Sequence, residues 1–378
     1  MKAIILAGGK ATRLRPLSCN TTKSMVPVLN RPFLEYIIGY LRKHDVNDII
    51  LTLSHESDQI KSYFGDGSKF GVEISYLIED LPLGSAGAVK NAEEFLDSPF
   101  IVFNGDIFTD LDLTAMVNLH SDRKARMTIA LTTVDDPTIY GIVEIDSQCR
   151  VKCFKEKPRC EEVTTNVINA GVYVLEPEIL DYIPSEVFFT FEHDIFPAAI
   201  EGGQAIYGYP FEGYWIDIGT PEKYLKLNHD LLQRYFNNGV EFENEGFVHP
   251  TARIEGPVLI GGGCTVDRNC VIKGLVALGS GCQIAEGAIV EGALLWRDCK
   301  IGKGTKLKNC VLASNCYVGD ETEILDNCVL GDNVTIGKGN KLPQGVRVWP
   351  DKSIEANSIS LRNIRGEGKI ISEVNFWI

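Results

Sequence analysis

Leu6-Ala-Gly-Gly-Lys-Ala-Thr-Arg-Leu-Arg-Pro-Leu17 decides the fold, because it joins an apolar segment to a Gly-rich, basic loop. Residues 1–7 are rich in Ile and Leu, a composition that predicts a buried strand. The Gly pair then allows unusual backbone conformations and the close approach of a ligand. Successive N–H groups in such a loop attract anions, and Arg13, Arg15 and Lys23 add positive charge. We therefore expect a strand that leads into a phosphate-binding loop.

Patterns typical of strands and helices alternate after this loop. Helices are predicted over 33–44, 59–64, 85–95 and 220–235, and strands over 48–54, 72–78, 100–103, 125–133, 141–145 and 169–175. This alternation indicates an α/β fold, a Rossmann-like and mostly parallel sheet with helices on both faces. Ligands bind such sheets beyond the carboxyl ends of the strands. We expect this domain to occupy residues 1–236.

A six-residue repeat follows near residue 248. One aliphatic residue recurs at every sixth position, with two steps of five: Ile254, Ile260, Val266, Ile272, Leu278, Ile284, Val290, Leu295, Ile301, Leu307, Leu312, Val318, Ile324, Leu330, Ile336, Leu342, Val348 and Ile354. This period fits neither a helix nor an alternating strand and predicts a hexapeptide left-handed β-helix with the aliphatic side chains inside. We expect the β-helix to occupy residues 248–378 and to serve in oligomerisation or regulation.

Seven of the eleven cysteines fall at one position of this repeat, two residues before an inward aliphatic: Cys264, Cys270, Cys282, Cys299, Cys310, Cys316 and Cys328. That position favours a small side chain, so we interpret them as reduced packing residues and not as metal ligands or disulfides. No histidine follows His249, which argues against the acyltransferases that combine such coils with a catalytic histidine. The apolar residues 374–378 are expected to dock on the coils or on another subunit.

The composition is that of an ordinary soluble protein, with 44% hydrophobic and 23% charged residues among 378. No apolar run reaches the length of a membrane span and no signal peptide is evident, so we expect a cytoplasmic protein. A formal net charge of −14 argues against nucleic acid or an anionic membrane as a partner. Phosphate ligands must then be held by local positive charge.

The complete set of motifs is more specific than the Gly pair, which alone is often only a turn. The loop is neither a Walker A sequence nor a dinucleotide G-x-G-x-x-G. With Lys23, Asn104-Gly-Asp106 and Trp215-Ile-Asp-Ile-Gly219, it resembles the sugar-1-phosphate nucleotidyltransferases, whose signature is G-G-x-G-T-R-L followed by a lysine. The chain is most similar to the mannose-1-phosphate guanylyltransferase branch, in which the β-helix follows. Ala11 replaces the third glycine of the signature, so we expect a negative φ there.

The resemblance implies a role for each motif. Catalysis is implied for Arg13, Lys23, Asp106 and Asp217, nucleotide binding for Leu6, Ala7, Gly8, Gly9 and Gly84, and sugar-phosphate binding for Gly141, Glu156, Lys157 and Asn169. Asp106 and Asp217 would also bind Mg²⁺, which takes one or two carboxylates together with phosphate oxygens. Asp106 considered alone could equally cap a loop.

The implied reaction is NTP plus sugar 1-phosphate giving NDP-sugar and pyrophosphate. An ionised sugar phosphate is already a nucleophile, so catalysis would rest on in-line positioning and charge neutralisation. GTP with mannose 1-phosphate, giving GDP-mannose, is the favoured pair, and UTP or dTTP with glucose 1-phosphate is an alternative. Another alternative is a catalytically inactive paralogue that binds an NDP-sugar in a regulatory role. We expect a homo-oligomer, a dimer or larger, that involves the β-helix.

Overall fold

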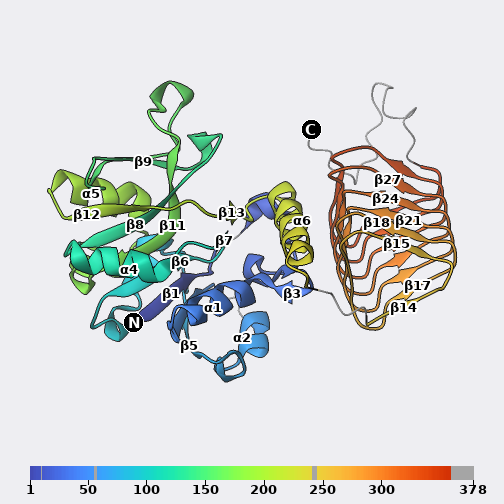
Figure 1. The fold of residues 1–378 in the computed structure, drawn as a ribbon, viewed down its shortest axis with the longest axis horizontal. Helices are drawn as coiled ribbons and strands as arrows, with labels where there is room; N and C mark the ends of the chain where they lie inside the picture. Colours follow the sequence, from blue (N-terminus) through green and yellow to red (C-terminus); the bar gives the residue numbers. More distant parts are fainter. Residues whose placement is uncertain (10, 55–57, 241–244, 359–378) are drawn as a thin grey trace. The chain divides into compact units, whose positions relative to one another are not determined.

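The computed structural model describes residues 1–9, 11–54, 58–240 and 245–358 (Figure 1). These residues pack as two compact units. The first unit contains residues 1–9 and 34–217, and the second contains residues 11–33 and the chain from residue 218 onward. We call residues 11–33 the basic loop; it packs with the C-terminal part of the chain. The docking expected of residues 374–378 lies outside the described residues.

A nine-stranded sheet is the centre of the first unit, in the order β10-β9-β11-β6-β1-β4-β5, with β8 beside β11 and β12 beside β8. Its strands are β1 (Lys2–Leu6), β4 (Asp48–Leu53), β5 (Glu73–Ile78), β6 (Phe100–Asn104), β8 (Met127–Thr133), β9 (Gly141–Ile145), β10 (Val151–Glu156), β11 (Val167–Leu175) and β12 (Ile206–Pro210). Strands β6, β1, β4 and β5 are parallel, and the predicted Rossmann-like α/β class is confirmed. Strand β11 runs antiparallel to β6, β8 and β9, so the other half of the sheet is mixed.

The central strand shows why the sheet forms where the sequence predicts it. Ala3, Ile4 and Ile5 of β1 are fully buried, as expected for a parallel strand covered on both faces. The helices are α1 (Phe33–Lys43), α2 (Asp58–Phe64), α3 (Gly84–Lys90), α4 (Leu113–Asp122), α5 (Phe196–Glu201) and α6 (Pro221–Asn237). The helix predicted over 85–95 is shorter than expected, because α3 ends at Lys90 and a separate 3-10 turn spans Glu93–Phe95.

Three parallel sheets form the β-helix of the second unit. The first contains β14 (Phe247–Val248), β17 (Thr265–Val266), β20 (Gln283–Ile284), β23 (Lys300–Ile301), β26 (Tyr317–Val318), β29 (Thr335–Ile336) and β32 (Ser353–Ile354). The second contains β15 (Arg253–Glu255), β18 (Val271–Lys273), β21 (Ile289–Glu291), β24 (Lys306–Lys308), β27 (Glu323–Ile324) and β30 (Lys341–Leu342). The third contains β16 (Val258–Ile260), β19 (Val276–Leu278), β22 (Leu294–Leu295), β25 (Val311–Leu312), β28 (Val329–Leu330) and β31 (Arg347–Val348).

The predicted inward series forms the core of these coils. Every member from Ile260 to Ile354 is buried, and Ile254 packs against the same core while remaining half-buried. The seven coil cysteines are free thiols, buried in that core, in agreement with their interpretation as packing residues. The Sγ of Cys299, for example, donates to the Ala313 carbonyl of the next coil at 3.1 Å.

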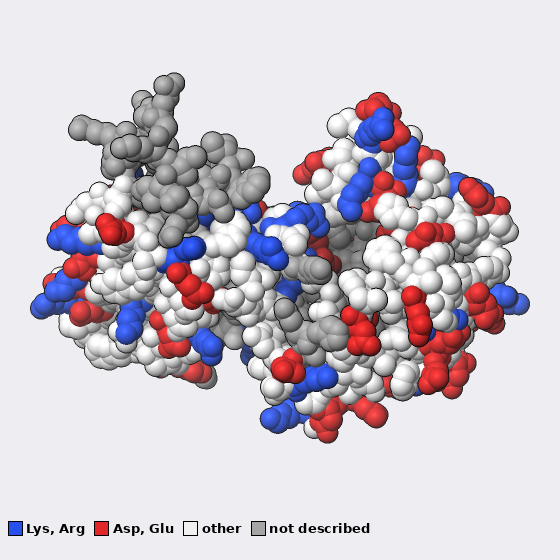
Figure 2. All heavy atoms as spheres, turned by 180° about the vertical axis from the view of Figure 1, so that it is seen from behind, with Lys and Arg blue, Asp and Glu red and all other residues white. Residues whose placement is uncertain are grey.

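Charged side chains of both signs are scattered among uncharged residues on the face of the coils that Figure 2 shows. Glu323 pairs with Lys306 on the preceding coil at 3.0 Å and with Lys341 on the following coil at 2.6 Å. Among the described residues, no helix has the length and hydropathy that a membrane crossing needs.

Candidate active site

Two aspartates lie at neighbouring backbone positions beyond the carboxyl end of β6. Asp106 follows β6 and directly precedes β7 (Ile107–Thr109), which pairs antiparallel with β13 (Trp215–Asp217). In this pairing Asp217 lies opposite Ile107. The Cα atoms of opposed antiparallel residues are about 4.5–5.5 Å apart. The backbone therefore brings Asp106 and Asp217 to neighbouring positions from distant parts of the sequence.

Gly105 explains how Asp106 is placed. The Gly105 N–H donates to the Leu6 carbonyl at the end of β1 at 3.0 Å, and a Cβ on Gly105 would lie 2.5 Å from that oxygen. Only a glycine allows such a close approach of two backbones. The segment that carries Asp106 is thus fixed against the strand that leads into Gly8 and Gly9.

Asp217 is 7% exposed and is held by aromatic neighbours. The Tyr140 hydroxyl donates to its Oδ2 at 2.6 Å, and the Tyr140 ring lies edge-on to Trp215 at 5.4 Å between centroids. Trp215 in turn donates from Nε1 to the Ala170 carbonyl at 2.9 Å. Sequence reasoning missed the role of Tyr140, because its contact with Asp217 exists only in the folded chain.

The donor set fits a hard divalent cation. Two aspartates at neighbouring backbone positions, one oriented by a phenol hydroxyl, suit a cation that completes its shell with water and phosphate oxygens. Within the described ranges no group of three His, Cys, Asp or Glu residues could hold a metal by itself. A metal on Asp106 and Asp217 would complete its shell with water and with oxygens of a ligand.

Gly141, Glu156 and Lys157 lie together at the ends of β9 and β10. Gly141 pairs with Glu156, and a Cβ at Gly141 would lie 2.8 Å from Glu156 Oε2, so the absent side chain leaves room for the carboxylate. Lys157 Nζ is 3.2 Å from Glu156 Oε1. The Lys157 backbone is left-handed (φ 43°), and its N–H donates to the Tyr140 carbonyl at 3.0 Å. Tyr140 thereby connects these residues to Asp217.

Asn169 belongs to a network that the sequence did not reveal. Its Oδ1 accepts from the Gly171 N–H at 2.9 Å, and its Nδ2 donates to the Tyr173 hydroxyl at 2.8 Å, where the register of β11 shifts. The Tyr173 hydroxyl donates to Glu192 at 3.4 Å, and Ser85 Oγ donates to the other Glu192 oxygen at 2.7 Å. Burial raises the pKa of Glu192.

The predicted nucleotide-binding glycines differ in what they do. Gly8 and Gly9 are not among the glycines that adopt a positive φ. A Cβ on Gly8 would lie 3.4 Å from the Ser54 nitrogen and 3.5 Å from Glu79 Oε1, whereas Gly9 faces open space. Gly84 does need its glycine, because its φ is 75° and a Cβ would lie 2.5 Å from the Phe189 carbonyl. The contact that excludes a side chain at Gly84 is therefore made by the chain itself.

Leu6 and Ala7 lie where β1 ends. The Leu6 carbonyl accepts from Gly105, and the Ala7 N–H donates to the Thr52 carbonyl at 3.0 Å. Both residues are half-buried beside the neighbouring strands. Their position at the carboxyl end of a central parallel strand is the one expected for ligand contact.

Arg13 and Lys23 belong to the basic loop of the second unit. Arg13 lies in a 3-10 turn (Thr12–Leu14) and is exposed, and Lys23 begins another (Lys23–Met25) and is half-buried. The fully buried Leu14 and Leu17 anchor the intervening chain.

Ala11 corrects one expectation. Its φ is 47°, in the left-handed region, so the predicted negative φ is wrong. The residue caps the 3-10 turn: its carbonyl accepts from the Leu14 N–H at 3.1 Å and from Ser18 Oγ at 2.8 Å. These two hydrogen bonds retain the sharp turn even though alanine occupies the position.

Two family models match the chain. One described as "Nucleotidyl transferase" matches residues 2–234, and one described as "EIF2B subunit epsilon LbH domain" matches residues 238–342.

Curated relatives match most of the chain. A UTP--glucose-1-phosphate uridylyltransferase from Synechocystis sp. is 36% identical over 356 residues, covering 88% of this chain and 87% of that protein. A mannose-1-phosphate guanyltransferase from Gibberella zeae is 34% identical over 369 residues, covering 94% of this chain and 98% of that protein. Among solved structures, HddC from Yersinia pseudotuberculosis complexed with GMP-PN has a TM-score of 0.53 and 34% identity, covering 61% of this chain and 99% of that one.

Proposed function

The chain belongs to the nucleotidyl transferase family, and from that membership we propose that it transfers the nucleotidyl group of GTP to mannose 1-phosphate, giving GDP-mannose and pyrophosphate. Transfer to a sugar 1-phosphate as a class is supported by the named relatives. The substrates are accordingly a nucleoside triphosphate and a sugar phosphate.

The choice of GTP and mannose 1-phosphate is supported by the Gibberella zeae relative, which matches nearly the whole of both chains. The guanine nucleotide analogue in the Yersinia structure supports the same base. The Synechocystis relative, with slightly higher identity, favours UTP with glucose 1-phosphate as the second candidate.

One observation carries the proposal: Asp217 pairs with Ile107, so its backbone lies next to that of Asp106 beyond the end of β6. Nucleotidyltransferases of this family generally use a divalent metal, and we assign Mg²⁺ to these two carboxylates. When bound, the ion would supply positive charge to the phosphate oxygens.

The chain's own residues would supply the remaining positioning. An oxygen of the sugar phosphate bonds to the α-phosphorus while the bond from that phosphorus to the β-phosphate oxygen breaks, and pyrophosphate leaves with the electron pair. We assign the sugar phosphate to Lys157, which Glu156 and the left-handed backbone hold beside Tyr140. Asn169 and Glu156 are assigned to the sugar hydroxyls.

Arg13, Lys23 and the amides that follow β1 are assigned to the nucleotide phosphates, on the resemblance of their motif. Neutralising charge around the α-phosphorus is the main contribution expected of them. A cytoplasmic location and an oligomer formed through the β-helix are further parts of the proposal.

The test is pyrophosphate release with Mg²⁺ across four NTPs crossed with mannose, glucose, galactose and N-acetylglucosamine 1-phosphates. We expect release with GTP and mannose 1-phosphate above all other pairs. A clear preference for UTP with glucose 1-phosphate would establish the second candidate, and no release with any pair would leave the regulatory paralogue.

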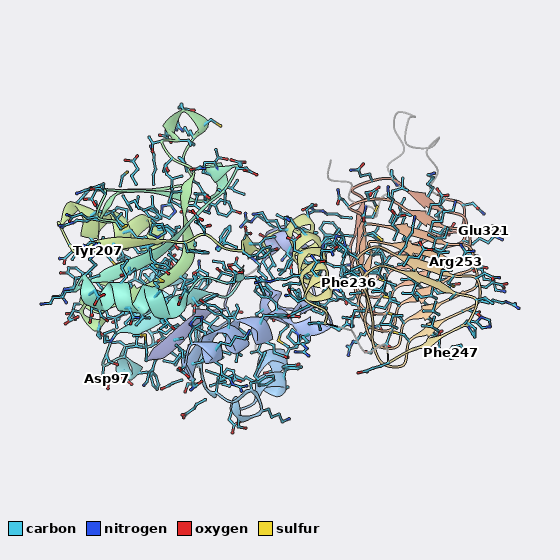
Figure 3. The ribbon with its side chains drawn as sticks, viewed as in Figure 1. Asp97, Tyr207, Phe236, Phe247, Arg253 and Glu321 are labelled. Atoms are coloured by element: carbon cyan, nitrogen blue, oxygen red, sulfur yellow. The ribbon has the colours of Figure 1, made fainter. Side chains whose placement is uncertain are left out.

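Three variants test the carboxylates. Asp106→Ala and Asp217→Ala should each lower kcat by about 100-fold or more, the size expected for losing a group that acts on transition-state charge. Asp97→Ala is the matched control, because Asp97 is exposed on the surface of the first unit (Figure 3). Full activity in Asp106→Ala or Asp217→Ala would remove that carboxylate from the mechanism.

A further inference from the structure

One sheet of the β-helix is apolar on its outer side. We call the sheet β16-β19-β22-β25-β28-β31 the covered sheet. Its inward residues, buried in the coil core, include Leu278, Leu295, Leu312 and Leu330. The residues just before them point outward because side chains alternate along a strand. These outward residues are Ala277, Leu294, Val311 and Val329, and each is at most 4% exposed.

The outward residues of the other two sheets are exposed or half-buried instead of buried. The corresponding outward residues of β23 and β26 are Lys300 and Tyr317, and both are exposed. Figure 3 shows that Phe247, Arg253 and Glu321 likewise lie on the outer surface of the coils. The covered sheet therefore carries a buried apolar stripe.

Helix α6 lies against this side of the coils. Trp296, which follows the covered strand β22, donates from Nε1 to the Tyr224 hydroxyl at 3.0 Å. Tyr224 in turn donates to the Pro27 carbonyl of the basic loop. Further along α6, His229 Nε2 hydrogen-bonds the Gly292 carbonyl at 2.9 Å.

The basic loop is attached at its C-terminal end by α6 and by the coils. The Leu29 N–H donates to Asn228 Oδ1 at 2.9 Å, and Asn30 Nδ2 donates to the carbonyl of Leu278 on the covered sheet at 2.8 Å. Asn228 is 1% exposed, so the first of these contacts is out of water.

The last coils reach the middle of the same loop. Arg347 of β31 donates from Nη1 to the Arg15 carbonyl at 3.5 Å and from Nη2 to Glu222 at the start of α6 at 2.9 Å. Asp332, which is 7% exposed, accepts from the Ser314 N–H at 3.1 Å and interacts with the side-chain amide of Asn20. Arg15 and Asn20 lie between Arg13 and Lys23 in the sequence.

We propose that the last coils of the β-helix position the nucleotide-binding loop, with Arg347 and Asp332 as positioning residues. This inference rests on the proposed function, in which Arg13 and Lys23 bind the nucleotide phosphates. The β-helix then affects the reaction directly: it fixes the backbone from Arg15 to Asn20 and thereby the arrangement of the two phosphate-binding cations.

The test compares the full-length chain with Arg347→Ala, Arg347→Lys and Asp332→Asn. We expect Arg347→Ala, which removes the hydrogen bonds, and Asp332→Asn, which removes the negative charge, each to raise KM for the NTP about tenfold, as expected when a charge-assisted hydrogen bond to the loop is lost or made neutral. KM for the sugar 1-phosphate should change little. Arg347→Lys keeps the positive charge and should recover part of the NTP affinity. A merely structural role would not separate the two KM values.

Arg268→Ala is the matched control. Arg268 is also a coil arginine that pairs with a glutamate: its Nε is 2.9 Å from Glu286 Oε1. This ion pair joins two neighbouring coils at the surface. We expect this variant to retain the wild-type KM for both substrates. Equal effects of Arg268→Ala and Arg347→Ala would overturn the inference.

Amide hydrogen exchange provides a readout that needs no activity. In Arg347→Ala and Asp332→Asn, exchange in residues 12–22 should become at least several-fold faster, while the coil core from Ile260 to Leu342 stays protected and so shows that the variants fold. Unchanged exchange in residues 12–22 would overturn the inference. If the wild-type chain releases no pyrophosphate, the proposed function fails, and the exchange result still decides whether the coils hold the loop.

Discussion

At the scale of single residues, Ala11 has a left-handed backbone that its residue type does not predict. A left-handed alanine costs roughly 1–2 kcal/mol relative to a right-handed one, whereas glycine adopts this region freely. Ala11 nevertheless has a φ of 47°, held by the Leu14 N–H and Ser18 Oγ. Its local turn is determined by partners up to seven residues away, and a rule based on residue type cannot include them.

Ala11→Gly should therefore stabilise the chain. We expect the free energy of unfolding to rise by about 0.5–1 kcal/mol, since relief of the left-handed strain outweighs the added freedom of the unfolded glycine. Urea unfolding of the full chain measures this change. Ala198→Gly in α5 is the control and should destabilise by about 0.5–1 kcal/mol, because that alanine is helical. A loss of stability in Ala11→Gly would contradict the argument.

Tyr140 is the residue whose chemistry became visible only in the structure. Its hydroxyl orients Asp217 at 2.6 Å. Tyr140→Phe removes this hydrogen bond and keeps the ring against Trp215, so we expect the half-saturating Mg²⁺ concentration to rise about 10-fold, as for other residues that orient a metal ligand. Initial rates across a Mg²⁺ titration provide the measurement.

Tyr207→Phe controls for the loss of a phenol hydroxyl. Tyr207 lies in β12 of the nine-stranded sheet (Figure 3), whereas β13 pairs with β7 in a separate two-stranded sheet. We expect its Mg²⁺ dependence to match that of the wild type. An unchanged Mg²⁺ dependence in Tyr140→Phe would show that the hydroxyl does not act on the metal ligand.

At the scale of elements, α6 forms as its sequence predicts. Thr220 caps the helix by accepting from the Lys223 N–H, and Pro221 occupies its first position. The helical period also predicts its apolar face. The period does not reveal what this face meets, because Trp296 and Gly292 come from the coils, which are distant in sequence.

His229 on α6 predicts a pH dependence of stability. Burial lowers the pKa of His229, and the neutral ring hydrogen-bonds the Gly292 carbonyl. Below the unfolded pKa of about 6.5 the unfolded state binds more protons than the folded state, so this residue's contribution is present above that pH and is lost as the pH falls towards the folded pKa. His229→Gln keeps a donor and removes the titration.

Urea unfolding at pH 7.5, 6.5 and 5.5 tests this expectation. The wild type should lose more stability on acidification than His229→Gln. His193→Gln is the control, because His193 is exposed, and it should follow the wild type. Parallel curves for the wild type and His229→Gln would remove His229 as a cause.

At the scale of the whole molecule, regular patterns were predictable and their mutual packing was not. The alternation of strands and helices predicted the α/β class, and the six-residue period predicted the inward series from Ile254 to Ile354, since each signal comes from residues close together in the sequence. The candidate carboxylates Asp106 and Asp217 follow from motif resemblance, whereas the pairing of β7 with β13, which brings their backbones to neighbouring positions, required the fold. The grouping of residues 11–33 with the chain after residue 218 has no local signal in the sequence.

That grouping predicts the effect of removing the coils. A fragment of residues 1–240 retains the basic loop and α6 and loses the covered sheet, so Tyr224 loses Trp296, and Asn20 and Arg15 lose Asp332 and Arg347. We expect the fragment to melt at least about 5 °C below the α/β transition of the full chain, because a loss of 1 kcal/mol shifts the melting temperature of such a domain by roughly 2–4 °C. Circular dichroism melts provide the comparison.

Trp296→Phe in the full chain tests the contact between α6 and the coils that Trp296 makes. It keeps an aromatic side chain on the coils and removes the Nε1 bond to Tyr224 together with part of the buried indole, so its melting temperature should fall less than that of the fragment. The match to the HddC structure from Yersinia pseudotuberculosis covers 61% of this chain and 99% of that one. A related chain therefore folds without an equivalent of the rest of this chain. If residues 1–240 melt at the temperature of the full chain, then the apolar stripe of the covered sheet contributes nothing to the stability of α6 or the basic loop. A lower melting temperature of the fragment would mean that the coils are part of the folding unit that carries Arg13 and Lys23. A domain boundary drawn at residue 236 would then divide that unit.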